Sequence, residues 1–278
     1  MGHLDGKVAF ITGAAIGQGR SHAVKLAEAG ADIIAIDLCD EVPTIEYAQG
    51  TADDLAETAR LVEAQDRRIF TAHADVRDLA TLKTAVDRGV AQLGRLDIVL
   101  ANAGIASFAP ADEITEEMWN DVIDINLTGV FKTVVAALPH LKANGDGGSI
   151  VMTSSNAGIK GLGNLAHYTA AKHGVVGLMK TLANELGQYN IRVNTIHPTA
   201  VNTNMIQNQK TYSIFRPDLA KGSITRDDVE ESFLGLNILP VPWIEPEDIS
   251  NGILYLVSDA ARYVTGIQLP VDAGSITK

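Results

Sequence analysis

Short runs of β-branched and other apolar residues alternate along the chain with longer stretches of helical periodicity. Several runs are apolar at consecutive positions, which is typical of strands buried on both faces. The pattern predicts strands at 7–12, 31–37, 68–75, 96–102, 148–154, 191–197 and 266–272. Repeated strand-helix alternation predicts an α/β fold: one doubly wound Rossmann-type domain over residues 1–278, with a seven-stranded parallel sheet and helices on both faces.

Local signals mark two helix boundaries. The periodic stretch 21–30 ends at Gly30, a typical C-terminal stop. Thr115 precedes Glu116 and Glu117, which predicts a capped helix start with acidic residues at the positive end of the helix dipole.

Two segments interrupt the alternation. Residues 38–51 are an insertion longer than a strand-to-helix connection usually needs. Residues 199–245 carry many apolar side chains without steady periodicity, which favours an apolar lid over a substrate site. The alternatives are a surface loop for the first segment and a pair of surface helices packed on the core for the second.

Composition narrows the possible partners. The chain has 278 residues, 46% of them hydrophobic, with a net charge of −12, which disfavours nucleic acid and anionic membranes as partners. The single cysteine, Cys39, excludes an intrachain disulfide and fits a reducing cytoplasm. We expect no signal peptide, no membrane span and a cytoplasmic protein. The histidines form no ligand pattern, so no metal site is predicted.

A glycine-rich turn follows the first predicted strand and opens the first helix. Its glycines are Gly13, Gly17 and Gly19, in the stretch TGAAIGQG. Glycines permit a tight turn and let backbone N–H groups approach a pyrophosphate at the positive end of a helix. Ile16 lies within this turn and brings no positive charge to a phosphate.

Asp37, followed by Leu38, ends the second predicted strand. A carboxylate there can accept hydrogen bonds from an adenosine ribose and repels a 2′-phosphate, so the sequence favours NAD over NADP. Arg20, just past the last glycine of the turn, is the one neighbouring residue that could bind such a phosphate instead.

Further candidates end the third and fourth predicted strands. Asp75 and Val76 are placed to contact adenine, although Asp75 could simply cap the following helix. Asn102, Ala103 and Gly104 form the stretch NAG. The small residues would let the backbone lie against a cofactor, while Asn102 could also tie neighbouring strands together.

Tyr168 and Lys172 form the pair most suggestive of chemistry. In a helix, side chains four positions apart lie on nearly one face, about 6 Å apart along the axis. An ammonium about 4 Å from a phenolate contributes about 4 kcal/mol at an effective dielectric near 20. That equals roughly three pKa units, so we expect Lys172 to lower the pKa of Tyr168 and allow general base catalysis. A surface tyrosine beside an incidental lysine is the alternative.

Two further residues support the catalytic interpretation. Ser155 closes the fifth predicted strand and is placed to hydrogen-bond a substrate oxygen. Asn126 lies in a long predicted helix, where Asn is a poor helix former, and we expect its side chain to hold a water that links Lys172 to solvent.

Throughout its length the chain resembles the short-chain dehydrogenase/reductase family. That family carries TGxxxGxG, NAG, a catalytic Asn, and Ser, Tyr and Lys at S-x12-Y-x3-K spacing. The resemblance implies Tyr168 as acid/base, Lys172 as pKa tuner and ribose contact, Ser155 as substrate positioner and Asn126 as proton-relay anchor. The family's usual Pro-Gly is Pro198 followed by Thr199 here. Val201 and Thr203 match the segment that holds the nicotinamide carboxamide.

Longer stretches, among them 17–40 and 197–205, resemble the carveol-dehydrogenase-like, mycofactocin-associated members of that family. This implies oxidation of small apolar secondary alcohols, terpenoid ones among them, with firmly held NAD that mycofactocin recycles. We expect the 38–51 insertion to cover the adenosine half of the dinucleotide. The resemblance also implies a homotetramer.

Two other functions remain open on the sequence. One is an NADPH-linked ketone or 3-oxoacyl-thioester reductase, which Asp37 opposes. The other is a non-catalytic nucleotide-binding regulator, which would have no need of Tyr168 and Lys172 together.

Overall fold

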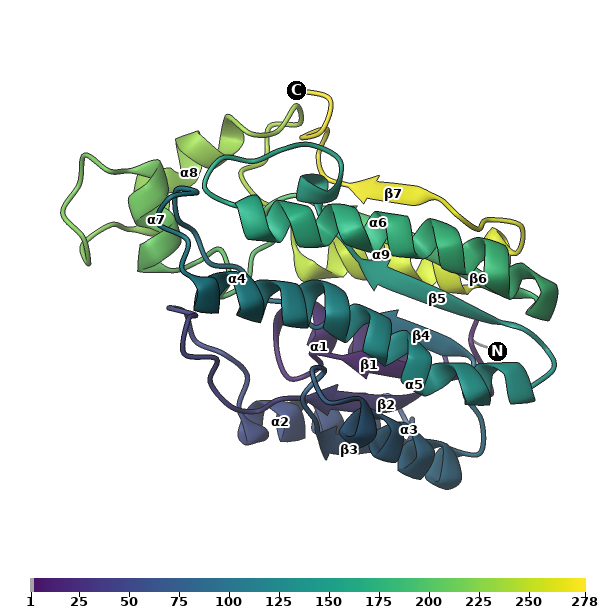
Figure 1. Ribbon diagram of the computed structural model, residues 1–278. Coiled ribbons are helices and arrows are strands. Elements are labelled where there is room, and N and C mark those ends of the chain that lie inside the picture. Colours follow the sequence, from purple (N-terminus) through teal and green to yellow (C-terminus); the bar gives the residue numbers. More distant parts are fainter. Residues whose placement is uncertain (1–2) are drawn as a thin grey trace.

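Seven parallel strands form the centre of the structure, a computed structural model that describes residues 3–278 (Figure 1). The strands are β1 Val8–Thr12, β2 Asp32–Asp37, β3 Ile69–His73, β4 Ile98–Ala101, β5 Gly148–Thr153, β6 Ile191–Pro198 and β7 Gln268–Val271. Their order is β3-β2-β1-β4-β5-β6-β7, so β2 and β3 lie on one side of β1 and β4 to β7 lie on the other. The predicted doubly wound sheet is confirmed, and its switch point lies between β1 and β4.

Helices cover both faces of the sheet (Figure 1). One face carries α3 Leu79–Leu93, α4 Glu116–Ile123, α5 Val130–Ala143 and α6 Ala166–Leu186, and the other carries α1 Gly17–Glu28, α2 Ala52–Glu63 and α9 Pro246–Val257. Alternate residues of β1 point to the two faces: Phe10 belongs to the first core cluster and Ile11 to the second. Both side chains are fully buried, which explains why the strand is apolar at consecutive positions.

Element ends differ from the sequence expectations by a few residues. The helix predicted at 21–30 begins at Gly17, within the glycine-rich turn, and ends at Glu28. Gly30 follows it with φ of 108°, a conformation that favours glycine. Thr115 caps α4 as expected, because its side chain accepts a hydrogen bond from the N–H of Met118 at 3.1 Å.

The long helix that contains Asn126 is not regular. Between α4 and α5, residues Asp124–Gly129 form a π-helical turn, in which each turn is wider than in an α-helix. Short 3₁₀ turns lie at Asn156–Gly158, Gly187–Tyr189 and Asp259–Ala261.

The whole stretch Glu116–Ala143 is long and apolar enough to pass as a membrane span by length and composition, which we did not expect. Half of its most apolar window is buried inside the protein. The core helix of a soluble protein passes the same test, so this helix is weak evidence for a span.

The two irregular segments adopt different structures. Residues 38–51 contain no helix or strand, but Val42 and Ile45 are buried and pack on the core. Residues 199–245 hold two short helices, α7 Gln209–Phe215 and α8 Arg226–Leu234. These helices enclose a small apolar cluster of their own, formed by Tyr212, Ile224, Val229, Phe233 and Trp243.

Candidate active site

A cavity of about 320 Å³ opens at the carboxyl ends of the strands. Every candidate site residue from the sequence lines it except Asn126. The lining candidates are Gly13, Ile16, Gly17, Gly19, Asp37, Leu38, Asp75, Val76, Asn102, Ala103, Gly104, Ser155, Tyr168, Lys172, Pro198, Val201 and Thr203. Parallel strands gather these positions because all their carboxyl ends lie at one edge of the sheet.

The glycine turn has room only for glycine. Gly13 has φ of 67°, and a Cβ there would lie 2.8 Å from Cα of Ala103. A Cβ on Gly19 would lie 1.9 Å from the carbonyl oxygen of Gly13. The turn therefore packs backbone against backbone and leaves the start of α1 open to the cavity, as a pyrophosphate site requires.

Asp37 is fixed at the edge of this turn. Its carboxylate accepts hydrogen bonds from the N–H of Ala15 at 2.8 Å and of Cys39 at 3.4 Å. Burial raises the pKa of Asp37, and the backbone N–H donors, Leu38 among them, oppose that rise. The carboxylate thus lies beside the cavity in a position preorganised to accept further hydrogen bonds.

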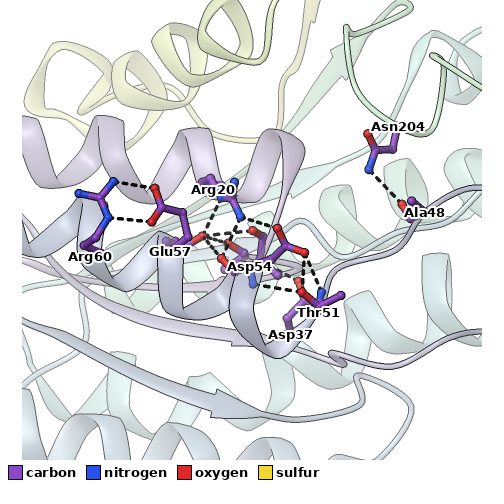
Figure 2. A network of polar contacts seen from close by, with 11 residues as sticks. Arg20, Asp37, Ala48, Thr51, Asp54, Glu57, Arg60 and Asn204 are labelled. Atoms are coloured by element: carbon purple, nitrogen blue, oxygen red, sulfur yellow. Dashed lines mark hydrogen bonds and ion pairs between the residues drawn. The ribbon is translucent and has the colours of Figure 1, made fainter.

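The Arg20 guanidinium binds residues of α2 and does not line the cavity. Figure 2 shows its guanidinium turned toward Asp54, and it donates to the Asp54 carbonyl oxygen at 2.8 Å and carboxylate at 3.1 Å. Its Nε donates to the Thr58 hydroxyl at 3.0 Å. These contacts join α1 to α2, so the positive charge is already paired within the protein.

The sequence left two roles open for Asp75, an adenine contact or a helix cap, and the structure decides against the cap. Its carboxylate is bound by Arg77, whose Nε donates to Oδ2 at 2.8 Å. The cap of α3 is Asp78 instead, which accepts from the N–H groups of Ala80 and Thr81. The capping alternative for Asp75 is therefore wrong.

Asn102 joins three strands, as one interpretation proposed. Its amide donates to the carbonyl oxygen of Thr12 at 3.0 Å, and its oxygen accepts from Thr153 at 3.2 Å. These bonds fix the switch point between β1 and β4 and connect it to β5.

Tyr168, Lys172 and Ser155 all line the cavity; the first two lie on the first turns of α6, and Ser155 follows β5. Lys172 is 3% exposed and lies 5.4 Å from the centre of the Tyr168 ring. It donates a hydrogen bond to the carbonyl oxygen of Thr153 at 2.8 Å, and burial lowers its pKa to about 8.

We expected Lys172 to lower the pKa of Tyr168. This expectation is wrong where only the groups of the protein itself act on the phenol. Burial raises the pKa of Tyr168, and the hydroxyl of Ser155 opposes that rise. The ammonium of Lys172 is directed at Thr153 rather than at the phenol oxygen, while loss of hydration disfavours the phenolate.

Asn126 lies beside the cavity but not in its wall. Its side chain is fully buried and pairs twice with the backbone of Ile105, donating at 2.7 Å and accepting at 2.8 Å. A Cβ on Gly104 would lie 3.1 Å from Asn126 Oδ1 and 3.5 Å from Lys172 Nζ. The side chain holds the chain after β4 in place, and the water-holding role expected from the sequence stays a prediction.

Two polar side chains at the site were not predicted from the sequence. Tyr47, from the 38–51 insertion, lines the cavity, and its oxygen accepts from the N–H of Ala106 at 3.1 Å. His197 is fully buried and contacts the carbonyl oxygen of Ser155 at 2.7 Å; burial lowers its pKa to about 4. No sequence motif marks either residue, because the hydrogen-bond partner of each lies at least 42 positions away in the sequence.

Thr199, where the resembled family has glycine, fits without strain. It is not among the residues with positive φ in the described chain. Its hydroxyl donates to Asn237 at 3.1 Å, which links the start of the 199–245 segment to its end.

The 199–245 segment gives the cavity an apolar wall. Met205, Ile206, Phe215, Phe233 and Leu236 all line it. The polar groups are thus concentrated where the strands end, and the space above them suits a largely apolar molecule.

Known proteins share this architecture over the full chain. The family model for short chain dehydrogenases matches residues 7–213. The (-)-trans-carveol dehydrogenase of Rhodococcus erythropolis is 56% identical over 279 aligned residues, which cover 100% of both proteins. The crystal structure of carveol dehydrogenase from Mycobacterium avium in complex with NAD is 55% identical, with a TM-score of 0.98 and 100% coverage of both chains. A short chain dehydrogenase from Mycobacterium paratuberculosis, bound to NAD in its crystal structure, is 46% identical, with a TM-score of 0.91 and 100% coverage of both chains. The chain belongs to the short-chain dehydrogenase family.

Proposed function

We propose that the protein interconverts a small, largely apolar secondary alcohol and its ketone with NAD. One observation carries the proposal: Tyr168 and Ser155 share a single cavity with the glycine turn, under an apolar wall. The relatives that are carveol dehydrogenases make a terpenoid alcohol of that kind the first substrate to test.

The residues around the cavity fit NAD. The glycine turn offers backbone N–H groups at the start of α1 to a pyrophosphate. The Asp37 carboxylate would accept from the ribose hydroxyls and repel a 2′-phosphate, and Arg20 is paired with Asp54. This arrangement disfavours the NADPH-linked ketone or 3-oxoacyl-thioester reductase.

The chain's own residues handle the proton. Ser155 would hold the substrate oxygen, and Tyr168 would exchange a proton with it at the phenol oxygen. When bound, NAD⁺ supplies the hydride acceptor and a positive charge that favours the phenolate. Because burial raises the pKa of Tyr168, the phenol holds its proton at neutral pH, which suits proton donation to a ketone.

We further propose that the dinucleotide exchanges slowly. Gly50, in the insertion, approaches Asp37: a Cβ there would lie 3.5 Å from Oδ1. Asn204 of the 199–245 segment donates to the carbonyl oxygen of Ala48 in the insertion at 3.1 Å (Figure 2). The two segments would thus act as a lid over the cavity, and an external partner such as mycofactocin would recycle the cofactor in place.

The same resemblance supports a homotetramer in the cytoplasm. Light scattering after gel filtration tests the assembly: a monomer in solution would contradict it. A regulator without activity is the competing function, and it is opposed by the buried Lys172, whose charge carries a desolvation cost that mere nucleotide binding does not need.

The decisive experiment is a screen of secondary alcohols, with carveol first, using purified protein and an artificial electron acceptor. Protein purified without added nucleotide should retain NAD after desalting. Tyr168→Phe should lower turnover at least a hundredfold, since it removes the acid/base group, while bound NAD is retained. Undiminished turnover in that variant would exclude Tyr168 as the acid/base.

A further inference from the structure

Tyr47 is a polar group of the cavity that the reaction described above does not use. It comes from the 38–51 insertion, whereas Ser155 follows β5 and Tyr168 lies in α6. Its ring packs against the larger core cluster. The side chain is partly buried, and this burial raises the pKa of its phenol.

Among the described residues, the hydroxyl of Tyr47 accepts a hydrogen bond but donates none. Its oxygen accepts from the N–H of Ala106 at 3.1 Å. Within residues 3–278, no acceptor takes its proton. A buried hydroxyl that donates to nothing costs about 1–3 kcal/mol, so the group favours an acceptor supplied by whatever fills the cavity.

The surroundings restrict where that acceptor comes from. Phe108 and Leu165 are apolar members of the same cavity wall, and no side chain within residues 3–278 accepts a hydrogen bond from Tyr47. Tyr168 is near enough to raise the pKa of Tyr47 further through charge repulsion. The free donor therefore faces the same cavity as Tyr168 and comes from a different segment of the chain than Ser155.

We propose that Tyr47 is a specificity-determining residue, which donates a hydrogen bond to a second oxygen of the substrate. This rests on the proposed function and narrows its substrate class. The preferred substrate is a cyclic secondary alcohol that bears a carbonyl, ether or hydroxyl oxygen away from the reacting carbon. An alcohol with one oxygen is still oxidised, but the Tyr47 proton stays unpaired.

The test compares Tyr47→Phe with the unaltered protein on two kinds of substrate. The probes are cyclohexanol and cyclohexanols that carry an oxo group at ring position 3 or 4. The variant should lower kcat/KM about tenfold for the best oxo-substituted alcohol, mostly through KM, and leave cyclohexanol within about twofold. Tyr189→Phe, which alters an exposed tyrosine beyond the far end of α6, should change neither.

Equilibrium binding of the matching ketones provides a second readout. The diketones should bind the unaltered protein more tightly than cyclohexanone, and Tyr47→Phe should remove that difference. If no alcohol is oxidised, the proposed function fails, while the binding comparison still decides the role of Tyr47. Equal losses on all probes would show a purely structural role, and no change on any probe would show that the hydroxyl meets no substrate; either result overturns the proposal.

Discussion

Lys172 donates a hydrogen bond from its ammonium to the carbonyl oxygen of Thr153, the last residue of β5, across 2.8 Å. This contact joins α6 to the end of β5 beside the cavity. Since the side chain is 3% exposed, the charge is held away from water, and burial lowers the pKa of the ammonium to about 8.

Lys172→Met should change how stability depends on pH. In the unaltered protein, the unfolded chain keeps the lysine proton up to about pH 10.4, whereas the folded state releases it near pH 8. The unfolded state therefore binds more protons between these values, and the free energy of unfolding rises with pH. Relative to the variant, the unaltered protein should gain up to about 3 kcal/mol between pH 7 and pH 10. Urea unfolding at both pH values measures this; a constant difference would contradict it.

Asp37→Asn should weaken the preference for NAD. The change keeps the shape of the side chain but removes the charge that would bind ribose hydroxyls and repel a 2′-phosphate. We expect about tenfold weaker NAD binding and improved NADP binding, measured by titration of nucleotide-free protein. Asp32→Asn is the matched control, because Asp32 starts the same strand and pairs with Arg68. An equal effect of both variants would contradict the role of Asp37.

Gly19→Ala should destabilise the protein by a few kcal/mol and abolish nucleotide binding. The added methyl would lie 1.9 Å from the Gly13 carbonyl oxygen, so the turn must shift. Gly177→Ala is the control within a helix: nothing lies within 4 Å of its Cβ, and alanine should stabilise α6 by up to about 1 kcal/mol. Thermal unfolding and NAD titration measure both, and a tolerated Gly19→Ala would refute the packing argument.

Removing the contacts between the two lid segments should speed dinucleotide release. Asn204 donates to Ala48, and Lys210 pairs with Glu46 at 2.8 Å. Both contacts are exposed and weak, so Asn204→Ala with Lys210→Ala should accelerate release about two- to tenfold. Arg60→Ala removes an exposed ion pair within α2 and should have no effect. Release is followed by the fluorescence of bound NADH.

The sequence was enough to predict which positions share the cavity. Consecutive apolar positions such as Phe10 and Ile11 identify strands buried on both faces, and parallel strands end at one edge. Gly13, Asp37 and Ser155 each follow or end such a strand, so their meeting follows from topology alone.

The directions of side chains, the partners of charged groups and the pKa values were not predictable from the sequence in this way. Arg20 is paired with Asp54, 34 positions away, and the pairing partner depends on how α2 packs on α1. The pKa of Tyr168 depends on its burial and on which acceptor the Lys172 ammonium binds. Tyr47 enters the site from an irregular segment, for which hydrophobic periodicity carries no information.

The π-helical turn at Asp124–Gly129 sets a limit on how this chain can change length. Such a turn holds about one residue more than an α-helical turn. Deleting a single residue here would let α4 and α5 wind as one regular helix with almost unchanged orientation, but it would remove the wide turn that presents Asn126 to Ile105. The extra residue therefore serves the contact at Asn126 and not the course of the helix.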